Sequence, residues 1–248
     1  TPFSLKNNEA KTTALGFDIG YPVYNSKLFS LQVFAEYNKI NFIGFTTSDS
    51  TFNRPTRSGT GLTIPGIKSK LLGVIDFSLE YRILNGSFLP KFFDQGYDLN
   101  RISTNIEGNS TRVLTKDMSI LKTASTTNSN GIHGSAGFSI FNLVTFSASY
   151  ANMKSDTSEI KSFNSFLVFN TENIPKISTA SAYFQRNDDS DPFDFKNPSI
   201  NTIMGYKIGY ELSRGVSLIW DFRQYYRDDG TGEVEAIKQT TIETTFNF

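Results

Sequence analysis

The chain has 248 residues, no cysteine, and 24 acidic residues against 24 basic ones. The lack of cysteine excludes a disulfide scaffold and thiolate chemistry. A formal charge of zero gives no electrostatic basis for binding nucleic acid, so no nucleic-acid partner is expected. No apolar run approaches the roughly 18 residues of a transmembrane helix. This length suits one large β domain, which we expect to span residues 1–248.

Apolar and polar residues alternate through most of the chain with the two-residue period of β-strands. In residues 73–84, for example, Ile75, Phe77, Leu79 and Tyr81 alternate with charged or hydroxyl side chains. The segment at 61–67 reads as a strand with an irregularity at Pro65. The pattern predicts eleven strands, at 13–23, 28–45, 61–67, 73–84, 131–140, 143–153, 162–170, 177–185, 202–212, 216–226 and 240–248.

Two stretches lack this period. Residues 1–12 read as an irregular lead-in, and residues 85–130 as a long loop or insertion, within which 104–127 form either a hairpin or irregular structure. The loop carries an aromatic cluster, which either packs the loop over the rim of the strands, the favoured interpretation, or folds inward as a constriction. The cluster consists of Phe88, Phe92, Phe93 and Tyr97.

The last strand, TTIETTFNF at 240–248, places Ile242, Phe246 and Phe248 on one face and ends on an aromatic residue. It resembles the closing strand of Gram-negative outer-membrane β-barrels, which ends in an aromatic preceded by alternating apolar residues. The resemblance implies an all-β fold, a transmembrane antiparallel up-and-down β-barrel, in the outer membrane of a Gram-negative bacterium. It also implies that these three residues form the signal read by the barrel-assembly machinery.

Two further patterns favour a membrane barrel over a soluble β-barrel or sandwich, whose faces would be inverted. Short connections at 24–27, 68–70, 141–142, 171–176 and 213–215 alternate with longer ones such as 46–59, 154–159 and 187–199. The strands also carry charges of both signs on the face opposite the apolar one, which we predict to line the lumen. These residues are Asp18, Glu36, Asp76, Glu80, Arg82, Lys207, Glu211, Asp221, Arg223 and Glu243.

The number of strands is odd. If the chain ends on the periplasmic side, the strand at 13–23 enters from outside, which is unusual for an even-stranded barrel. We therefore expect at least one strand before Thr1 in the full protein. The barrel would then have about 12 strands, or about 14 if 104–127 form a hairpin.

Signals for catalysis and for metals are weak. His133 is the one histidine, and a general base at the barrel rim, as in a rim hydrolase, is disfavoured against a plain polar residue. Asp188, Asp189 and Asp191 lack the spacing of a calcium motif, so a solvated acidic loop is favoured. We expect no enzyme activity, no cofactor and no metal site.

The predicted function is porin-like passage of small solutes through a mixed-charge lumen. The alternative is a closed barrel that serves as a membrane anchor or scaffold for an envelope or surface assembly. The expected partners are the lipid bilayer, the barrel-assembly machinery during insertion and, for the alternative, other envelope proteins.

Overall fold

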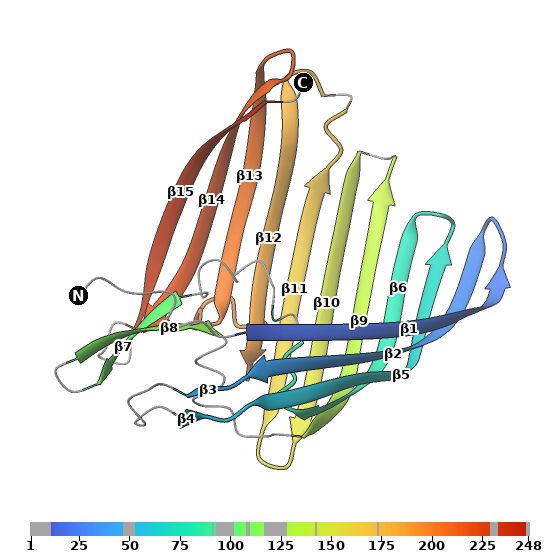
Figure 1. Ribbon diagram of the computed structural model, residues 1–248. Coiled ribbons are helices and arrows are strands. Elements are labelled where there is room, and N and C mark those ends of the chain that lie inside the picture. Colours follow the sequence, from blue (N-terminus) through green and yellow to red (C-terminus); the bar gives the residue numbers. More distant parts are fainter. Residues whose placement is uncertain are drawn as a thin grey trace. The chain divides into compact units, whose positions relative to one another are not determined.

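Every element that the structure describes is a β-strand, and eleven of them form one sheet in which each strand pairs with the next along the chain (Figure 1). The structure is a computed structural model and describes residues 11–46, 53–90, 92, 102–107, 110–116, 128–141, 143–172, 174–228 and 233–246. None of these residues belongs to a helix with the length and apolar character needed to cross a membrane.

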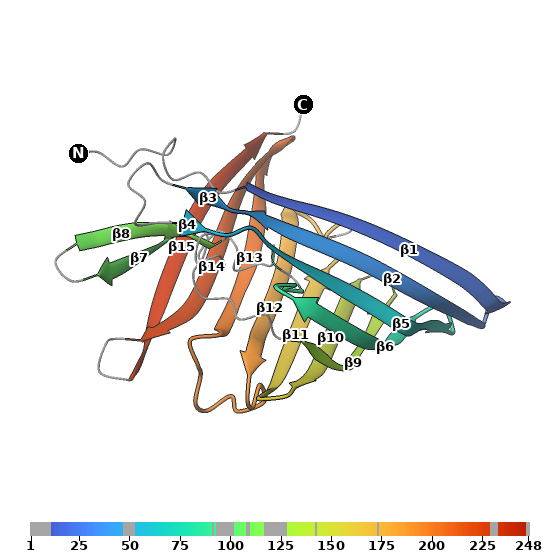
Figure 2. The same cartoon turned by 60° about the horizontal axis from the view of Figure 1, so that its bottom comes forward.

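The eleven strands, in the order in which they pair, are β1 (Lys11–Asn25), β2 (Phe29–Ile43), β5 (Arg57–Leu71), β6 (Ile75–Gly86), β9 (Ser129–Ile140), β10 (Val144–Ser155), β11 (Glu159–Phe169), β12 (Ile177–Asp189), β13 (Thr202–Ser213), β14 (Val216–Asp228) and β15 (Val234–Phe246). The pairs from β10 to β15 are antiparallel with continuous register apart from three local irregularities. Figure 2 shows β10 to β15 side by side. The eleven predicted strands and their up-and-down order are confirmed.

Two short hairpins lie outside this sheet. β3 (Phe45–Thr46) pairs with β4 (Asn53–Arg54), and β7 (Ile102–Glu107) pairs with β8 (Ser110–Thr115). The second pair gives part of the expected insertion at 85–130 a hairpin. Because it forms a two-stranded sheet of its own, it adds no strand to the eleven.

The connection lengths follow the predicted alternation only in part. The turn between β10 and β11 is tight, because Ser155 N donates to Ser158 O at 2.8 Å and Ser158 N donates to Ser155 Oγ at 3.1 Å. The prediction of a long loop at 154–159 was therefore wrong, since the strand pairing extends to Lys154 and Glu159. The connection between β12 and β13 is long, as expected.

Contacts divide the chain into two compact units. Unit 1 comprises residues 1–19, 34–65 and 82–130, and unit 2 comprises residues 20–33, 66–81 and 131–248. The division falls within β1, β2, β5 and β6, so each of these strands contributes to both units.

The strands of unit 2 expose their apolar side chains and bury their polar ones. On β14, Trp220 is 46% exposed whereas its neighbour Asp221 is 4% exposed. On β9, Ile132 is 55% exposed and His133 is 8% exposed. We call these two sides the apolar face and the polar face. Most of the fully buried side chains that lie on the polar face of this unit are therefore polar, including Asn164 and Gln185.

Unit 1 differs, because an apolar cluster lies on the side of its strands that carries the charged residues. Ile40, Phe42, Leu84 and Phe92 are all buried, and the rings of Phe42 and Phe92 meet edge-on with centroids 5.5 Å apart. The ring of Phe88 lies against Gly61, so close that a methyl group there would overlap it. Phe88 and Phe92 thus hold the start of the loop against the sheet, while Phe93 and Tyr97 lie outside the described residues.

Candidate functional site

The polar face of unit 2 brings together three of the predicted lumen residues around one carboxylate. Lys207 on β13 stands directly opposite Asp221 on β14, and its Nζ lies 3.2 Å from Asp221 Oδ2. Arg223, two residues further along β14 on the same face, donates from Nη2 to the same oxygen at 3.2 Å. Asp221 is buried between two partly exposed cations. This group is the charge cluster of β13 and β14.

A tyrosine that the sequence did not single out lies beside this cluster. Tyr183 on β12 and Arg223 on β14 are both register partners of Gly205 on β13. The phenol lies over this glycine, since a Cβ at position 205 would come within 2.8 Å of both Cζ and Oη of Tyr183. The missing side chain of Gly205 therefore leaves room for the Tyr183 ring beside the charges. A glycine at a polar-face position between two regular strands is the sequence signal for this contact.

A second polar contact joins β6 and β9. The Nδ1 atom of His133 lies 3.6 Å from Glu80 Oε2, and both side chains are about nine-tenths buried. Two residues along each strand, Ser78 Oγ and Ser135 Oγ are hydrogen-bonded to each other at 2.8 Å. The described contacts of His133 thus place it beside a carboxylate, and these two serines bond each other.

Hydroxyl groups line the polar face near the tight turns. A cavity of about 500 Å³ is bordered by side chains from β2, β5, β6, β9 and β10, among them Gln32, Ser78, Ser135 and Thr145. Ser139 and Thr145 pair through their hydroxyl groups at 3.1 Å. Lys70 and Asp76 form an ion pair of 3.6 Å at the edge of this region, with both side chains half exposed. The wall combines neutral polar groups with the Lys70–Asp76 pair and a further cation, Lys68.

The remaining predicted lumen residues lie apart from these contacts. In unit 1, Glu36 accepts a hydrogen bond from Asn38 at 2.8 Å, and Arg82 borders the same cavity of about 470 Å³ as these two residues. Asp18 on β1 and Glu243 on β15 are exposed, and these strands are the two ends of the sheet order. Glu211 lies near the end of β13, opposite Ser217.

The residues predicted as an assembly signal lie on β15. Ile242 and Phe246 are each 57% exposed and stand opposite Trp220 and Val216 of β14. They continue the apolar face of β13 and β14. Phe248 lies outside the described residues.

The described residues hold no group of three or more histidine, aspartate or glutamate side chains that could bind a metal ion. In particular, Asp189 of the acidic loop is engaged by Arg186, whose Nε lies 2.7 Å from Asp189 Oδ2.

The chain matches no known protein-family model. A search of curated proteins likewise finds no matching protein.

Proposed function

We propose that this chain is an outer-membrane β-barrel that passes small solutes through a lumen lined by its polar face. The observation that carries the proposal is the inverted burial of the strands. Phe17, Ile19, Ile208 and Trp220 are 46–66% exposed, while Glu80, His133 and Asp221 are at most 8% exposed. A soluble β-barrel would bury the first set and expose the second.

Removing a Phe, Ile or Leu side chain from water is worth about 1.5–3 kcal/mol, and the apolar face leaves many of these residues uncovered. A bilayer would cover them and recover this free energy. The charged side chains would then face water in the lumen or pair across strands, as Lys207 and Asp221 do.

The selectivity of such a lumen would be weak, because the charges on the polar face are of both signs and partly compensated. Asp221 is shared by Lys207 and Arg223, and Asp76 is paired with Lys70. The hydroxyl-lined region near the tight turns adds neutral donors and acceptors. Small polar solutes of either charge fit this wall better than one particular ion.

Two measurements test the proposal. A detergent-extracted membrane barrel migrates differently on unboiled and boiled SDS gels, so a protein that shows no such difference would contradict membrane insertion. Single-channel recording in a planar bilayer then tests passage, and the expected result is discrete conductance steps. Inserted protein without steps at any voltage would remove the pore.

The closed barrel, acting as an anchor or scaffold, is favoured by one specific observation. Unit 1 carries the cluster of Ile40, Phe42, Leu84 and Phe92 where an open channel would carry polar groups. Phe42→Ser with Phe92→Ser should raise conductance if this cluster obstructs passage. The same pair of substitutions should leave a wide channel unchanged.

A further inference from the structure

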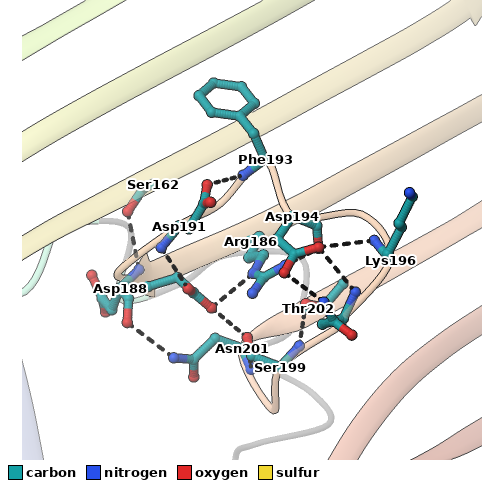
Figure 3. Close-up of polar contacts among 12 residues, drawn as sticks. Ser162, Arg186, Asp188, Asp191, Phe193, Asp194, Lys196, Ser199, Asn201 and Thr202 are labelled. Carbon is teal, nitrogen blue, oxygen red and sulfur yellow. Dashed lines mark hydrogen bonds and ion pairs between the residues drawn. The ribbon is translucent and has the colours of Figure 1, made fainter.

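The loop that follows β12 has a conformation fixed by a polar network at its base (Figure 3). Arg186, which is 5% exposed, donates from Nε to Asp189 Oδ2 at 2.7 Å and from Nη1 to the backbone oxygen of Asp194 at 2.6 Å. Ser199 Oγ donates to the same oxygen of Asp189 at 2.5 Å. One buried guanidinium thus ties the end of β12 to the middle of the loop.

The ring of Phe193 points away from this network in Figure 3. It stacks on Tyr150 of β10 with centroids 5.5 Å apart and an interplanar angle of 23°, and it lies 4.9 Å from the ring of Phe163 on β11. The ring of Phe195 lies 5.2 Å from that of Phe184 on β12. The loop therefore lies back over the strands and contacts three of them.

These three strand residues belong to the apolar face. Tyr150 stands opposite Phe163 in the register of β10 and β11, and Phe184 stands opposite Met204, two residues before the exposed Tyr206. The loop predicted as a solvated acidic loop thus places its two phenylalanines on the side of the sheet that we propose to face lipid.

Beyond Tyr150 and Phe163, the apolar face of β10 and β11 changes from apolar to polar residues. On β10 it carries Val144, Phe146 and Tyr150, and then Asn152 and Lys154. On β11 it carries Leu167 and Phe163, and then Lys161 and Glu159. Asn152, Lys154 and Lys161 all contact Glu159, so the surface beyond the rings is a polar network. Aromatic residues followed by charged ones mark the edge of the hydrocarbon layer in membrane barrels.

We propose that the β12–β13 loop is a lipid-binding collar, with Phe193 and Phe195 inserted into the interfacial region of the bilayer beside β10, β11 and β12. This inference rests on the proposed function, since it requires the apolar face to contact lipid. After packing on the strands, Phe193 is still 48% exposed and Phe195 is 62% exposed. Ile200, later in the same loop, is 55% exposed.

Two carboxylates of the loop are already engaged by donors of the loop itself. Asp194 accepts from the backbone of Lys196 and from the backbone and side chain of Asn197. Asp191 Oδ1 accepts from Phe193 N at 3.1 Å. Lipid is favoured over a partner protein because the exposed rings continue the apolar face without a break. A partner would have to cover that face as well.

The test uses the single tryptophan of the chain, Trp220, on the apolar face of β14. Wild-type protein, Trp220→Phe/Phe195→Trp and Trp220→Phe/Phe193→Trp are folded into phosphatidylcholine vesicles whose acyl chains carry bromine either near the headgroup or near the bilayer centre. Trp220→Phe/Lys154→Trp is the matched control, because position 154 has the same strand parity but lies beyond the polar boundary.

We expect the brominated lipids to quench the indole at position 195 or 193 about as much as they quench Trp220. For positions 193 and 195, bromine near the headgroup should quench more strongly than bromine near the bilayer centre. The indole at position 154 should lose little. Loss of Trp220 quenching would contradict the proposed function itself. Quenching of Trp220 without quenching at 193 and 195, in variants that still shift on unboiled gels, would overturn the collar. If the indoles at positions 193 and 195 are shielded from the brominated lipid to an extent that depends on the protein-to-lipid ratio, the collar is overturned in favour of a protein partner.

Discussion

The carboxylate of Asp221 is 4% exposed and is held by Lys207 and Arg223 at 3.2 Å each. Asp221→Asn should lower the free energy of unfolding by about 1 kcal/mol, because charge-assisted hydrogen bonds are lost but the two cations are partly solvated. Urea unfolding of the lipid- or detergent-folded protein measures this change.

The chain supplies a matched ion pair for comparison. Arg227 and Glu235 also pair at 3.2 Å across neighbouring strands, but both side chains are more than half exposed. Glu235→Gln should therefore change stability by close to zero. Equal effects of the two substitutions would mean that burial of Asp221 does not strengthen its contacts.

Substitution by alanine should have different effects on stability at two glycines of the strands, Gly205 and Gly134. A Cβ at Gly205 would lie 2.5 Å from the backbone oxygen of Phe222 and 2.8 Å from the Tyr183 ring, so Gly205→Ala should cost about 1–3 kcal/mol. At Gly134 the nearest atoms are 3.7 Å away, an ordinary contact, and Gly134→Ala should be tolerated. Thermal unfolding of both variants checks this, and similar melting temperatures would contradict it.

Asp194 gives the loop a predicted pH dependence. Hydrogen bonds from the side chain and backbone of Asn197 hold the pKa of this carboxyl below its usual range. A lowered pKa means that the stabilisation is present above the ordinary aspartate pKa and is lost as the pH falls through the lowered value. Hydrogen-exchange protection of the Lys196 and Asn197 amides should therefore fall at acidic pH, and Asp194→Ala should remove it at neutral pH.

Strand parity predicts which face a residue occupies, but not which distant partner it meets. Lys207, Asp221 and Arg223 lie on one hairpin, so their meeting follows from the register of β13 and β14. Glu80 and His133 meet across β6 and β9, which are separated by the long segment at 87–128. No local pattern encodes the register of such a pair, so the sequence predicted His133 only as a plain polar residue.

At the level of elements, the loop after β12 depends on Arg186. Arg186→Leu should leave the buried Asp189 without its cation and release the segment at 190–201. Limited trypsin digestion at Lys196 should become at least about tenfold faster, since about 1.4 kcal/mol of local stability corresponds to that factor. Arg227→Leu, which removes an exposed arginine, is the control, and the prediction is wrong if both variants are cleaved at the wild-type rate.

Period-two alternation located the eleven strands, because polar and apolar residues alternate over much of each strand. The predictions for the connections between strands were less complete, because loop residues also make contacts with the sheet that no local pattern shows. Residues 187–199 were predicted as a solvated acidic loop, and their aspartates gave no sign that Phe193 and Phe195 pack on the sheet. The connection at 154–159 was predicted to be one of the longer ones, whereas the strand pairing continues to Lys154 and Glu159.

At the level of the whole molecule, depth in the bilayer should decide the effect of a charge. Ile208 and Leu212 are 48% and 59% exposed on β13, so in water their replacement by arginine would be equally harmless. In a membrane barrel, Ile208→Arg at mid-strand should cost about 2–4 kcal/mol and Leu212→Arg near the strand end about 0–1 kcal/mol. The folded fraction in vesicles, read from unboiled gels, measures both. Equal folding of the two variants would contradict lipid contact along β13.

The order of the sheet has a consequence for how the chain reaches a membrane. β1 and β15 are its terminal strands, with 15 and 13 residues, and each hydrogen-bonds one neighbour in the described sheet. In hydrocarbon, each backbone N–H or C=O group left unpaired along an open sheet edge would cost several kcal/mol. On our proposal, strands therefore do not enter lipid one hairpin at a time. Edge pairing and insertion become a single cooperative event, whose rate should depend on the whole sheet.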